Sequence, residues 1–376
     1  MVIWCKMEEA HSLSADWIVD VTIRFSALWL MISFISTGGG RQVTKRATRF
    51  QAAGLVVLCG LMLLAFLSSI RFGIVQLPWG SVMDAFFSFD GSRDHLIIRS
   101  VRLPRAIIAV IVGSALAVAG CMMQAISRNA LAGPEVFGIN YGAALAAVLA
   151  SYYLGTTSLK LFAWSSLLGA AAAGVLVFVL SSAGRPAMSP VRLVLAGATL
   201  NLLFASLTQG MLIMNEQSLD TMRFWLAGAL TGRDMELLLQ VLPYVMTGLI
   251  AAFILSSQLN IFKLGEEVAQ GLGQRLKLIR IGCMVVIVLL AGSAVAIAGP
   301  IGFIGLAVPH MARMLTGGNY RWAVPYSAVL GALLLLAADI GARFVLPGQE
   351  IPVGVVTAFF GAPFLIYLVQ RKETTS

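Results

Sequence analysis

Few residues of this chain have the chemistry of a catalytic or metal site. The histidines at 11, 95 and 310 are far apart, no HExxH motif occurs, and the four cysteines lack CxxC spacing. None of the six lysines follows a glycine, as the end of a phosphate-binding loop requires. The sequence therefore predicts no catalytic residue, no metal ligand and no cofactor bound by this chain. If ATP powers it, a separate chain must hydrolyse that ATP.

Asp339 is the carboxylate closest to the interior of an apolar run, and Arg343 follows it by four residues. On a helix the two side chains lie on one face. Carboxylates buried at mid-membrane are typical of proton- or sodium-driven carriers, which keeps an ion-driven secondary carrier as an alternative. The favoured interpretation is a structural ion pair at the outer end of a span.

Arginines also end the longest outer segment, 68–105. Arg102 and Arg105 stand in the string Val-Arg-Leu-Pro-Arg, just before a span. A guanidinium fork suits bidentate pairing with carboxylates. The segment therefore predicts contact either with an external acidic protein or ligand, or with lipid headgroup phosphates.

The composition is that of a polytopic membrane protein. Of 376 residues, 59% are apolar and 11% charged, and the mean hydropathy is +0.89, which excludes a soluble enzyme. Gly299-Pro300 divides the longest apolar run into two helices, so we expect an all-α fold with ten transmembrane helices. The runs are 51–70, 106–127, 136–159, 161–184, 193–215, 237–262, 281–312, 322–338 and 351–370.

Charged residues indicate the orientation of these spans. If the loop at 38–50 is cytosolic, 15 of the 26 basic residues and four acidic residues lie inside, while the outer loops hold nine of each. The positive-inside rule supports this orientation and places both termini in the cytosol. The inner basic residues are Arg41, Lys45, Arg46, Arg49, Arg128, Arg185, Arg192, Lys263, Arg275, Lys277, Arg280, Arg313, Arg321, Arg371 and Lys372.

The inner segment 259–280 contains a candidate docking helix. Apolar Val268, Ala269 and Leu272 are spaced as in a short amphipathic helix, which Gly271 or Gly273 would end. Such a helix fits contact with a cytosolic protein, and a helix lying on lipid is the alternative.

An internal repeat connects the two halves of the chain. Gly-Ser-Ala-Leu-Ala-Val-Ala-Gly at 113–120 recurs as Gly-Ser-Ala-Val-Ala-Ile-Ala-Gly at 292–299, and the same offset of 179 matches Gly138 to Gly317. The loop charges give the two copies opposite directions, so the repeat is inverted. Inverted repeats are a recurring transporter architecture, although the small residues also suit close helix packing.

The first 50 residues lie apart from these runs. Asp20 and Arg24 interrupt the apolar stretch 17–35, which favours an interfacial segment or an extension over an eleventh span or a signal peptide. The expected domains are an N-terminal extension at 1–50, a transmembrane domain at 51–370 and a cytosolic tail at 371–376.

Seven strings, taken in order, resemble the FecCD-type permeases, the membrane subunits of ABC importers for ferric siderophores, haem and cobalamin. The resemblance runs from about residue 50 to 370. Its strings are Arg102-Leu-Pro-Arg105; Gln124-Ala-Ile-Ser-Arg-Asn-Ala-Leu-Ala-Gly-Pro134 with Phe137-Gly-Ile-Asn-Tyr-Gly-Ala143; Phe224-Trp-Leu-Ala-Gly228; Ala269-Gln-Gly-Leu-Gly273; Gly299-Pro-Ile-Gly-Phe-Ile-Gly-Leu-Ala-Val-Pro-His310; Ala338-Asp-Ile-Gly-Ala-Arg343; and Glu350-Ile-Pro-Val-Gly-Val-Val-Thr-Ala-Phe-Phe-Gly-Ala-Pro-Phe364.

The resemblance implies a type II ABC importer permease in the plasma membrane. Its expected partners are a second permease subunit, identical or paralogous, two cytosolic ATPase subunits that bind ATP and Mg, and an extracytoplasmic binding protein. Arg102, Arg105 and Arg343 match the arginines that meet acidic residues of the binding protein. The ATPase-coupling residues would be Glu267, Ala269, Gly271, Leu272 and Gly273.

The resemblance also assigns the pathway to the fifth span, where Met188, Ser189, Asn201 and Gln209 are candidate lining or gate residues. Two features depart from the pattern. Ala130 stands where the family usually has proline, so the turn loses a fixed φ, and residues 1–50 lie outside the resemblance. The function expected is inward transport of an iron(III) siderophore, with haem or cobalamin as alternatives.

Overall fold

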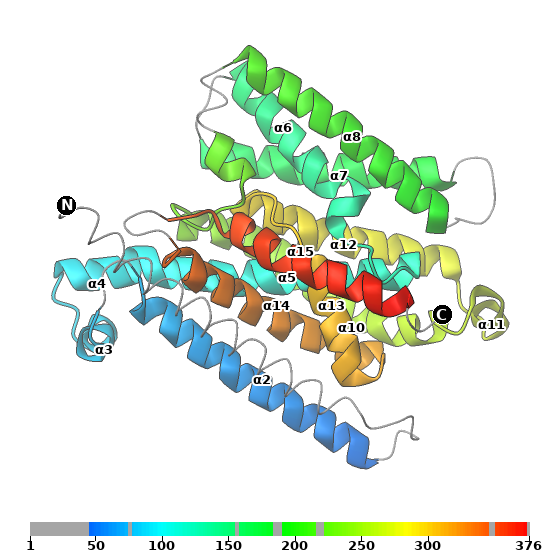
Figure 1. Ribbon diagram of the computed structural model, residues 1–376, viewed down its shortest axis with the longest axis horizontal. Helices are drawn as coiled ribbons and strands as arrows, with labels where there is room; N and C mark the ends of the chain where they lie inside the picture. Colours follow the sequence, from blue (N-terminus) through cyan, green and yellow to red (C-terminus); the bar gives the residue numbers. More distant parts are fainter. Residues whose placement is uncertain are drawn as a thin grey trace, which may run out of the picture. The chain divides into compact units, whose positions relative to one another are not determined.

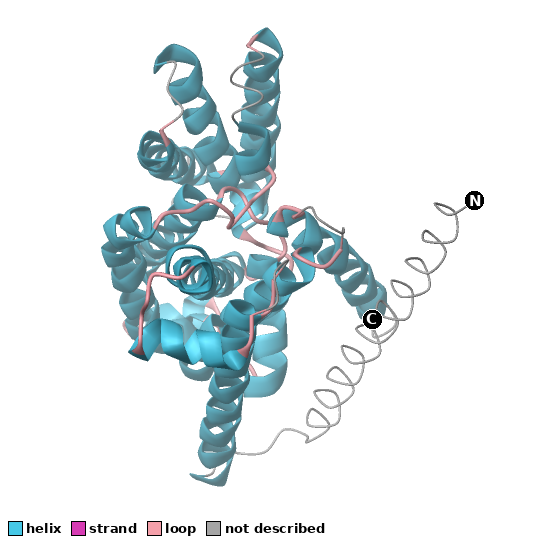
Figure 2. Ribbon diagram, turned by 90° about the vertical axis from the view of Figure 1, so that its left-hand side faces the viewer, coloured by secondary structure: helices cyan, strands magenta, loops and turns pink. Residues whose placement is uncertain are grey.

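The computed structural model describes residues 45–73, 77–154, 158–182, 190–215, 222–345 and 350–373. The chain divides into two compact units, residues 1–51 and 52–376. The described part of the second unit is built from helices joined by short loops, with no strand among the described residues (Figures 1 and 2). Met188 and Ser189, and nearly all of the N-terminal extension, lie outside the described residues.

Ten helices stand where the ten spans were predicted. Seven of them are long and apolar enough to cross a membrane, whereas α6 and α13 are shorter and only 353–366 of α15 forms an apolar stretch. At 1.5 Å per residue, the 16 residues of α6 cover only about 24 Å. The ten are α2 (Lys45–Arg71), α5 (Leu103–Ser127), α6 (Ile139–Leu154), α7 (Leu159–Ser182), α8 (Pro190–Met214), α10 (Met235–Phe262), α12 (Leu276–Ala298), α13 (Ile304–Thr316), α14 (Tyr320–Ala342) and α15 (Val353–Glu373).

The predicted outer loop 68–105 is largely helical. Helix α3 (Trp79–Phe87) is followed by α4 (Arg93–Ile97) and a π-helical turn, η1 (Ile98–Arg102), which runs directly into α5. The result is one continuous helical stretch from residue 93 to 127. Arg102 and Arg105 therefore lie on a helix whose neighbours fix their side chains.

Helix α5 forms the centre of the bundle and packs against α12, α13 and α14. Its glycines allow this. A Cβ at Gly113 would collide with the backbone of Gly331 on α14, and a Cβ at Gly120 would collide with the backbone of Gly305 on α13. Since helix association within lipid depends on close packing of small residues, these glycines explain why α5 is almost wholly buried.

The two copies of the repeat share local geometry at their ends. Gly138 and Gly317 both have positive φ, +78° and +66°, and both lie in a turn that leads into a helix: Gly138 directly precedes α6, and Gly317 lies in the turn between α13 and α14. The first copy continues as an unbroken α5. The second breaks after Gly299, whose φ is +75°, and resumes as the short α13. The break at Gly299-Pro300 is where the sequence predicted it.

Helices α6, α7 and α8 pack against one another on one side of α12 (Figure 1). Of the residues in the most apolar segment of α8, only 28% are buried, and in the corresponding segment of α2 only 11% are buried. Exposed leucines such as Leu195, Leu202 and Leu203 cover the open face of α8. These faces are free to meet lipid or another transmembrane subunit.

Candidate functional site

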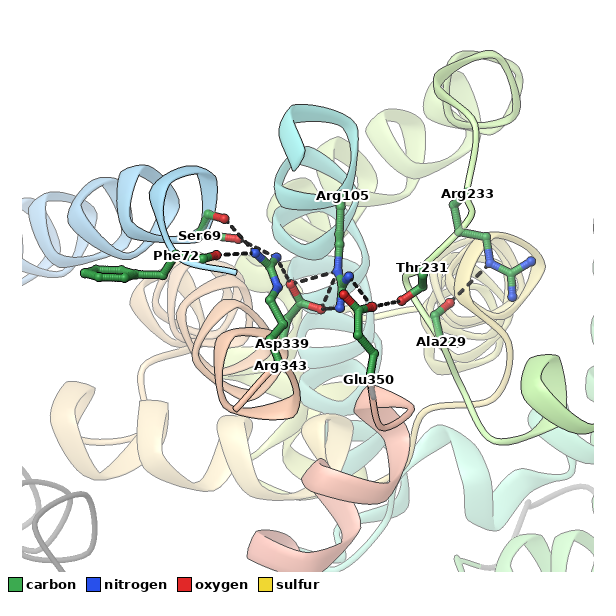
Figure 3. Close-up of polar contacts among 9 residues, drawn as sticks. All are labelled: Ser69, Phe72, Arg105, Ala229, Thr231, Arg233, Asp339, Arg343 and Glu350. Atoms are coloured by element: carbon green, nitrogen blue, oxygen red, sulfur yellow. Dashed lines mark hydrogen bonds and ion pairs between the residues drawn. The ribbon is translucent and has the colours of Figure 1, made fainter. Parts of the chain in front are cut away.

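A buried group of charges joins the helices at the end of the bundle that the sequence predicts to face outward; we call it the outer ionic network. Arg105 on α5 donates from Nε to the two carboxylate oxygens of Asp339 at 2.9 and 3.2 Å, and its Nη2 lies 2.8 Å from Oδ1. Asp339 also pairs with Arg343, one turn further along α14. The Asp339 side chain is fully buried between the two guanidinium groups (Figure 3).

Glu350, which precedes α15, extends this network. Its Oε2 accepts from Arg105 Nη1 at 2.7 Å and from the Thr231 hydroxyl at 2.8 Å. Burial alone would raise the pKa of Glu350, but the charge of Arg105 and these two hydrogen bonds outweigh it and hold that pKa below its ordinary value. Glu350 is therefore an ionised link between α5 and the segment that leads into α10.

Two of the arginines also cap the C-terminal end of α2. Arg343 Nη1 donates to the carbonyl oxygens of Ser69 and Phe72, both at 2.7 Å, and Arg102 Nη1 donates to those of Ile70 and Arg71 at 2.9 and 2.6 Å. The last carbonyls of a helix have no partner within the helix and carry partial negative charge. Cations at this position satisfy them and attach α2 to α5 and α14.

The three predicted docking arginines thus lie together, but with their side chains turned inward. Arg102, Arg105 and Arg343 are 6%, 6% and 4% exposed, and each donates to groups of this chain. The exposed cations of the outer segment are instead Arg93 and Arg99. Arg99 lies over the Phe89 ring at 4.3 Å and donates to the carbonyl of Ala85.

A cavity of about 340 Å³ opens beside the network. Its wall includes Trp225, Thr231, Arg233 and Glu350. Arg233 donates from Nε to the Ala229 carbonyl at 3.2 Å (Figure 3), and burial lowers its pKa to about 10. Since Arg105 and Thr231 already engage Glu350, the cavity presents the Arg233 cation next to aromatic surface.

At the opposite end of α10, the predicted cytosolic helix is present as α11 (Glu266–Gly271). Ala269 is fully buried against Phe262 and Leu276, and Glu266 forms an ion pair with Arg280 at 2.5 Å. These two contacts hold one face of α11 against the bundle. The other face is open, because Glu267 is exposed and Val268 and Leu272 are 49% and 62% exposed.

The two glycines at the end of α11 differ in conformation. Gly273 has a φ of +79°, in the region that favours glycine, whereas Gly271 is the last helical residue. A Cβ at either position would meet no neighbouring atom. Only at Gly273 does the backbone itself therefore resist substitution.

The predicted pathway residues of α8 lie on different faces. Asn201 donates to the Glu135 carbonyl at 2.7 Å and is half-buried, whereas Gln209 is exposed. The Oδ1 atom of Asn201 is buried and accepts no hydrogen bond from the described residues. The structure thus leaves Gln209 on the open face of α8 and places Asn201 against the segment before α6.

The Asp339–Arg343 ion pair was predicted from the sequence and is present, but sequence reasoning missed the other partners of the outer arginines. Ser69, Thr231 and Glu350 each contribute a group to the outer ionic network. Arg105 is 234 residues from Asp339 and 245 from Glu350, so no local spacing reveals the contacts. The available hint is that two acidic residues, Asp339 and Glu350, stand at the predicted outer ends of two adjacent spans.

Together, the apolar helical bundle, the internal repeat and the docked helix α11 define a polytopic membrane transport protein. Residues 61–371 match the model of the FecCD transport family. The chain belongs to this family, whose members are permease subunits of ABC importers, and ATP hydrolysis resides on a separate subunit.

Individual relatives are similar over nearly their whole length. The chain is 47% identical to the probable siderophore transport system permease protein YfiZ of Bacillus subtilis, over 84% of this chain and 95% of that protein. It is 40% identical to the ferric enterobactin transport system permease protein FepD of Escherichia coli, over 84% and 96%.

A solved structure of an ABC transporter assigned to the metal-chelate type, in an inward-facing conformation, matches with a TM-score of 0.74 and 30% identity. The match covers 85% of this chain and 99% of that one.

Proposed function

We propose that this chain is the permease subunit through which an iron(III) siderophore crosses the plasma membrane into the cell. The observation that carries the proposal is the 47% identity to a probable siderophore permease, which extends over 95% of that relative. Relatives named for ferric enterobactin and for iron(III) citrate support the same class of cargo. Iron travels inside its chelator, so the pathway needs no metal ligands of its own.

The partners in this proposal are a second permease subunit, two ATPase subunits that bind ATP and Mg, and an extracytoplasmic binding protein. The little-buried faces of α2 and α8 offer surface for the second permease. Both termini are cytosolic, in agreement with the distribution of basic residues over the loops.

The outer ionic network is the docking point for the binding protein. Arg102, Arg105 and Arg343 fix the outer ends of α2, α5 and α14 relative to one another. An acidic side chain of the binding protein would compete with Asp339 and Glu350 for the same guanidinium groups. Docking at this place therefore acts directly on the contacts that hold the outer helix ends together.

Helix α11 couples the bundle to the ATPase. The face of α11 that packs against the bundle is held by Ala269 and by the Glu266–Arg280 pair. A force applied to the exposed face of α11 is therefore transmitted to α10 and α12. Exposed Val268 and Leu272 are of the apolar type found at the centre of protein interfaces. Glu267, at the edge of this exposed face, makes ionic contacts with the ATPase in this proposal.

The transport proposal is tested with vesicles that contain the permease and its copurifying partners. Uptake of radioactive iron is measured for hydroxamate and catecholate chelates, with cobalamin and haem in parallel. We expect uptake of one ferric chelate that requires both ATP and the binding protein. Uptake driven by an ion gradient without ATP would contradict the proposal, and uptake of cobalamin or haem alone would move the cargo to those alternatives.

The coupling role is tested with Leu272→Asp. A carboxylate at the centre of an apolar contact must be desolvated without a partner, so ATP-dependent uptake should fall about tenfold or more. Phe87→Asp is the matched control, because Phe87 is 81% exposed on α3 at the other end of the bundle. Equal uptake by the two variants would remove α11 from the coupling surface.

A further inference from the structure

A second cavity lies between the ends of α5, α10, α13 and α14, at the end of the bundle that carries α11. Its volume is about 280 Å³. Three cations from three separate segments face it, together with one phenol and one amide. The residues that line it are Gln124, Ala125, Arg128, Ala130, Leu259, Lys263, Arg313 and Tyr320.

The cavity holds positive charge without an anion to balance it. Arg128 donates to the Phe262 carbonyl at 3.3 Å and Lys263 donates to the Gly318 carbonyl at 3.4 Å, and both acceptors are neutral. Arg128 also lies over the Phe262 ring at 5.0 Å. Within the described part of the chain, no Asp or Glu lines this cavity. Its walls therefore carry three formal positive charges.

Buried polar atoms at the same place also lack partners. The Nη1 atom of Arg313 is buried with no hydrogen-bond acceptor among the described residues. Gln124 is 4% exposed, and its Oε1 atom likewise has no donor in the described structure, although its amide nitrogen donates to the Leu306 carbonyl at 3.0 Å. An unpaired buried donor on a charged group is costly. Arg313 is therefore the clearest sign that something is bound here.

The position of the cavity restricts its ligand. Arg128 follows the last residue of α5, Lys263 follows the last residue of α10, and Arg313 lies in the last turn of α13. In the proposed orientation, these helix ends lie at the level of the lipid headgroups on the cytosolic side, where the basic residues of the loops gather. Basic pockets between transmembrane helices on the cytoplasmic side suit anionic headgroups.

We propose that this cavity binds the phosphate of an anionic phospholipid headgroup from the inner leaflet. Phosphate oxygens accept from Arg313 Nη1, Arg128 and Lys263, and a headgroup hydroxyl donates to Gln124 Oε1. A zwitterionic headgroup fits poorly, because its ammonium would add a fourth positive charge next to these three. The site is independent of the transported cargo, and it joins α5, α10 and α13 through one ligand.

The test is competitive lipid retention by the purified full-length permease with its copurifying partners. The protein is equilibrated with equal amounts of phosphatidylglycerol and phosphatidylcholine that carry the same acyl chains, and native mass spectrometry counts the lipids retained. We expect phosphatidylglycerol to be preferred about tenfold or more. The double variant Lys263→Gln, Arg313→Gln should lose this preference.

The matched control is the double variant Arg275→Gln, Lys277→Gln. It removes the same two charge types at the same end of the bundle, from exposed positions outside the cavity, and it should keep the wild-type preference. If Arg313→Gln prevents folding, Lys263→Glu reverses one charge at the exposed mouth, and Arg313→Lys retains the buried charge. The first should lose the preference and the second should keep most of it.

Retention of the two lipids in equal amounts by the wild type would overturn the proposal, as would an unchanged preference in the pocket variants. The unfolding temperature is also measured with inorganic phosphate and with phosphatidylglycerol. If both raise it equally and no lipid is retained, the assignment to lipid is overturned and the cavity is a site for free phosphate. Loss of the retained lipid whenever ATPase subunits are bound would instead assign the pocket to a carboxylate of that partner.

Discussion

At the scale of single residues, the outer ionic network keeps buried charges stable by giving each of them several partners. Asp339 lies between two guanidinium groups, and Arg343 also binds two carbonyls at the end of α2. A buried ion pair adds little net stability if its desolvation is only just repaid, but loss of one partner is strongly destabilising. Substitutions that remove one buried partner of the network should therefore destabilise the protein much more than substitutions that break an exposed ion pair.

We predict that Asp339→Asn destabilises the protein far more than loss of an exposed pair. The change keeps the side-chain volume but leaves Arg105 and Arg343 without their shared carboxylate, at a cost of about 3–5 kcal/mol. Lys160→Gln is the control, because it breaks an exposed pair with Glu236 that contributes at most about 1 kcal/mol. The measurement is the unfolding transition in detergent, and similar shifts for the two variants would contradict the prediction.

Glu350 gives the network a dependence on pH. Its pKa is lowered in the folded protein, so its contribution to stability is present above the pKa of an unfolded Glu, about 4.3, and is lost as the pH falls through the lower folded value. The wild-type unfolding temperature should drop more steeply below about pH 4.5 than that of Glu350→Gln. Parallel pH curves for the two proteins would show that Glu350 gains nothing from Arg105.

At the scale of helices, glycines determine how closely the central elements approach. Gly120 lies where α5 meets the backbone of α13, so added volume there can be accommodated only if one of the helices shifts. Lipid supplies no hydrophobic force to compensate for the lost contact, because its tails are as apolar as the side chains.

Gly120→Ala should therefore lower stability by about 1–3 kcal/mol through overpacking. Gly60→Ala is the matched control on α2, where a Cβ would meet no atom within 4 Å, and alanine is the better helix former. We expect its unfolding temperature to stay at or above that of the wild type. If the two alanine variants unfold together, close approach at Gly120 does not limit the packing of α5.

The sequence predicted these elements well wherever the cause was local. The break at Gly299-Pro300 and the short helix that begins at Glu266 both follow from residues within a few positions. The partners of Arg105 could not be predicted, since they come from α14 and from Glu350 in the loop before α15. The inward orientation of Arg102 and Arg343 also depends on carbonyls at the end of α2, which no spacing in the sequence marks.

At the scale of the whole molecule, the two ends of the bundle treat charge differently. The outer end pairs its arginines with Asp339 and Glu350 inside the protein, whereas the other end collects cations around a cavity without an acidic residue among its described lining. The positive-inside rule concerns the location of basic residues, not their pairing. The contrast in pairing is therefore a structural difference between the two ends, and the predicted orientation rests on the loop charges.

This orientation predicts which end of the bundle is accessible from outside the cell. Asp84→Cys, exposed on α3, should react with a membrane-impermeant maleimide on intact cells, whereas Glu267→Cys, exposed on α11, should react only after permeabilisation. The parent protein, with its own four cysteines, gives the background that is subtracted from both. The reverse pattern would place α11 outside, where no cytosolic ATPase reaches it, and would move the cationic cavity to the outer leaflet, so one labelling experiment tests the orientation on which both proposals depend.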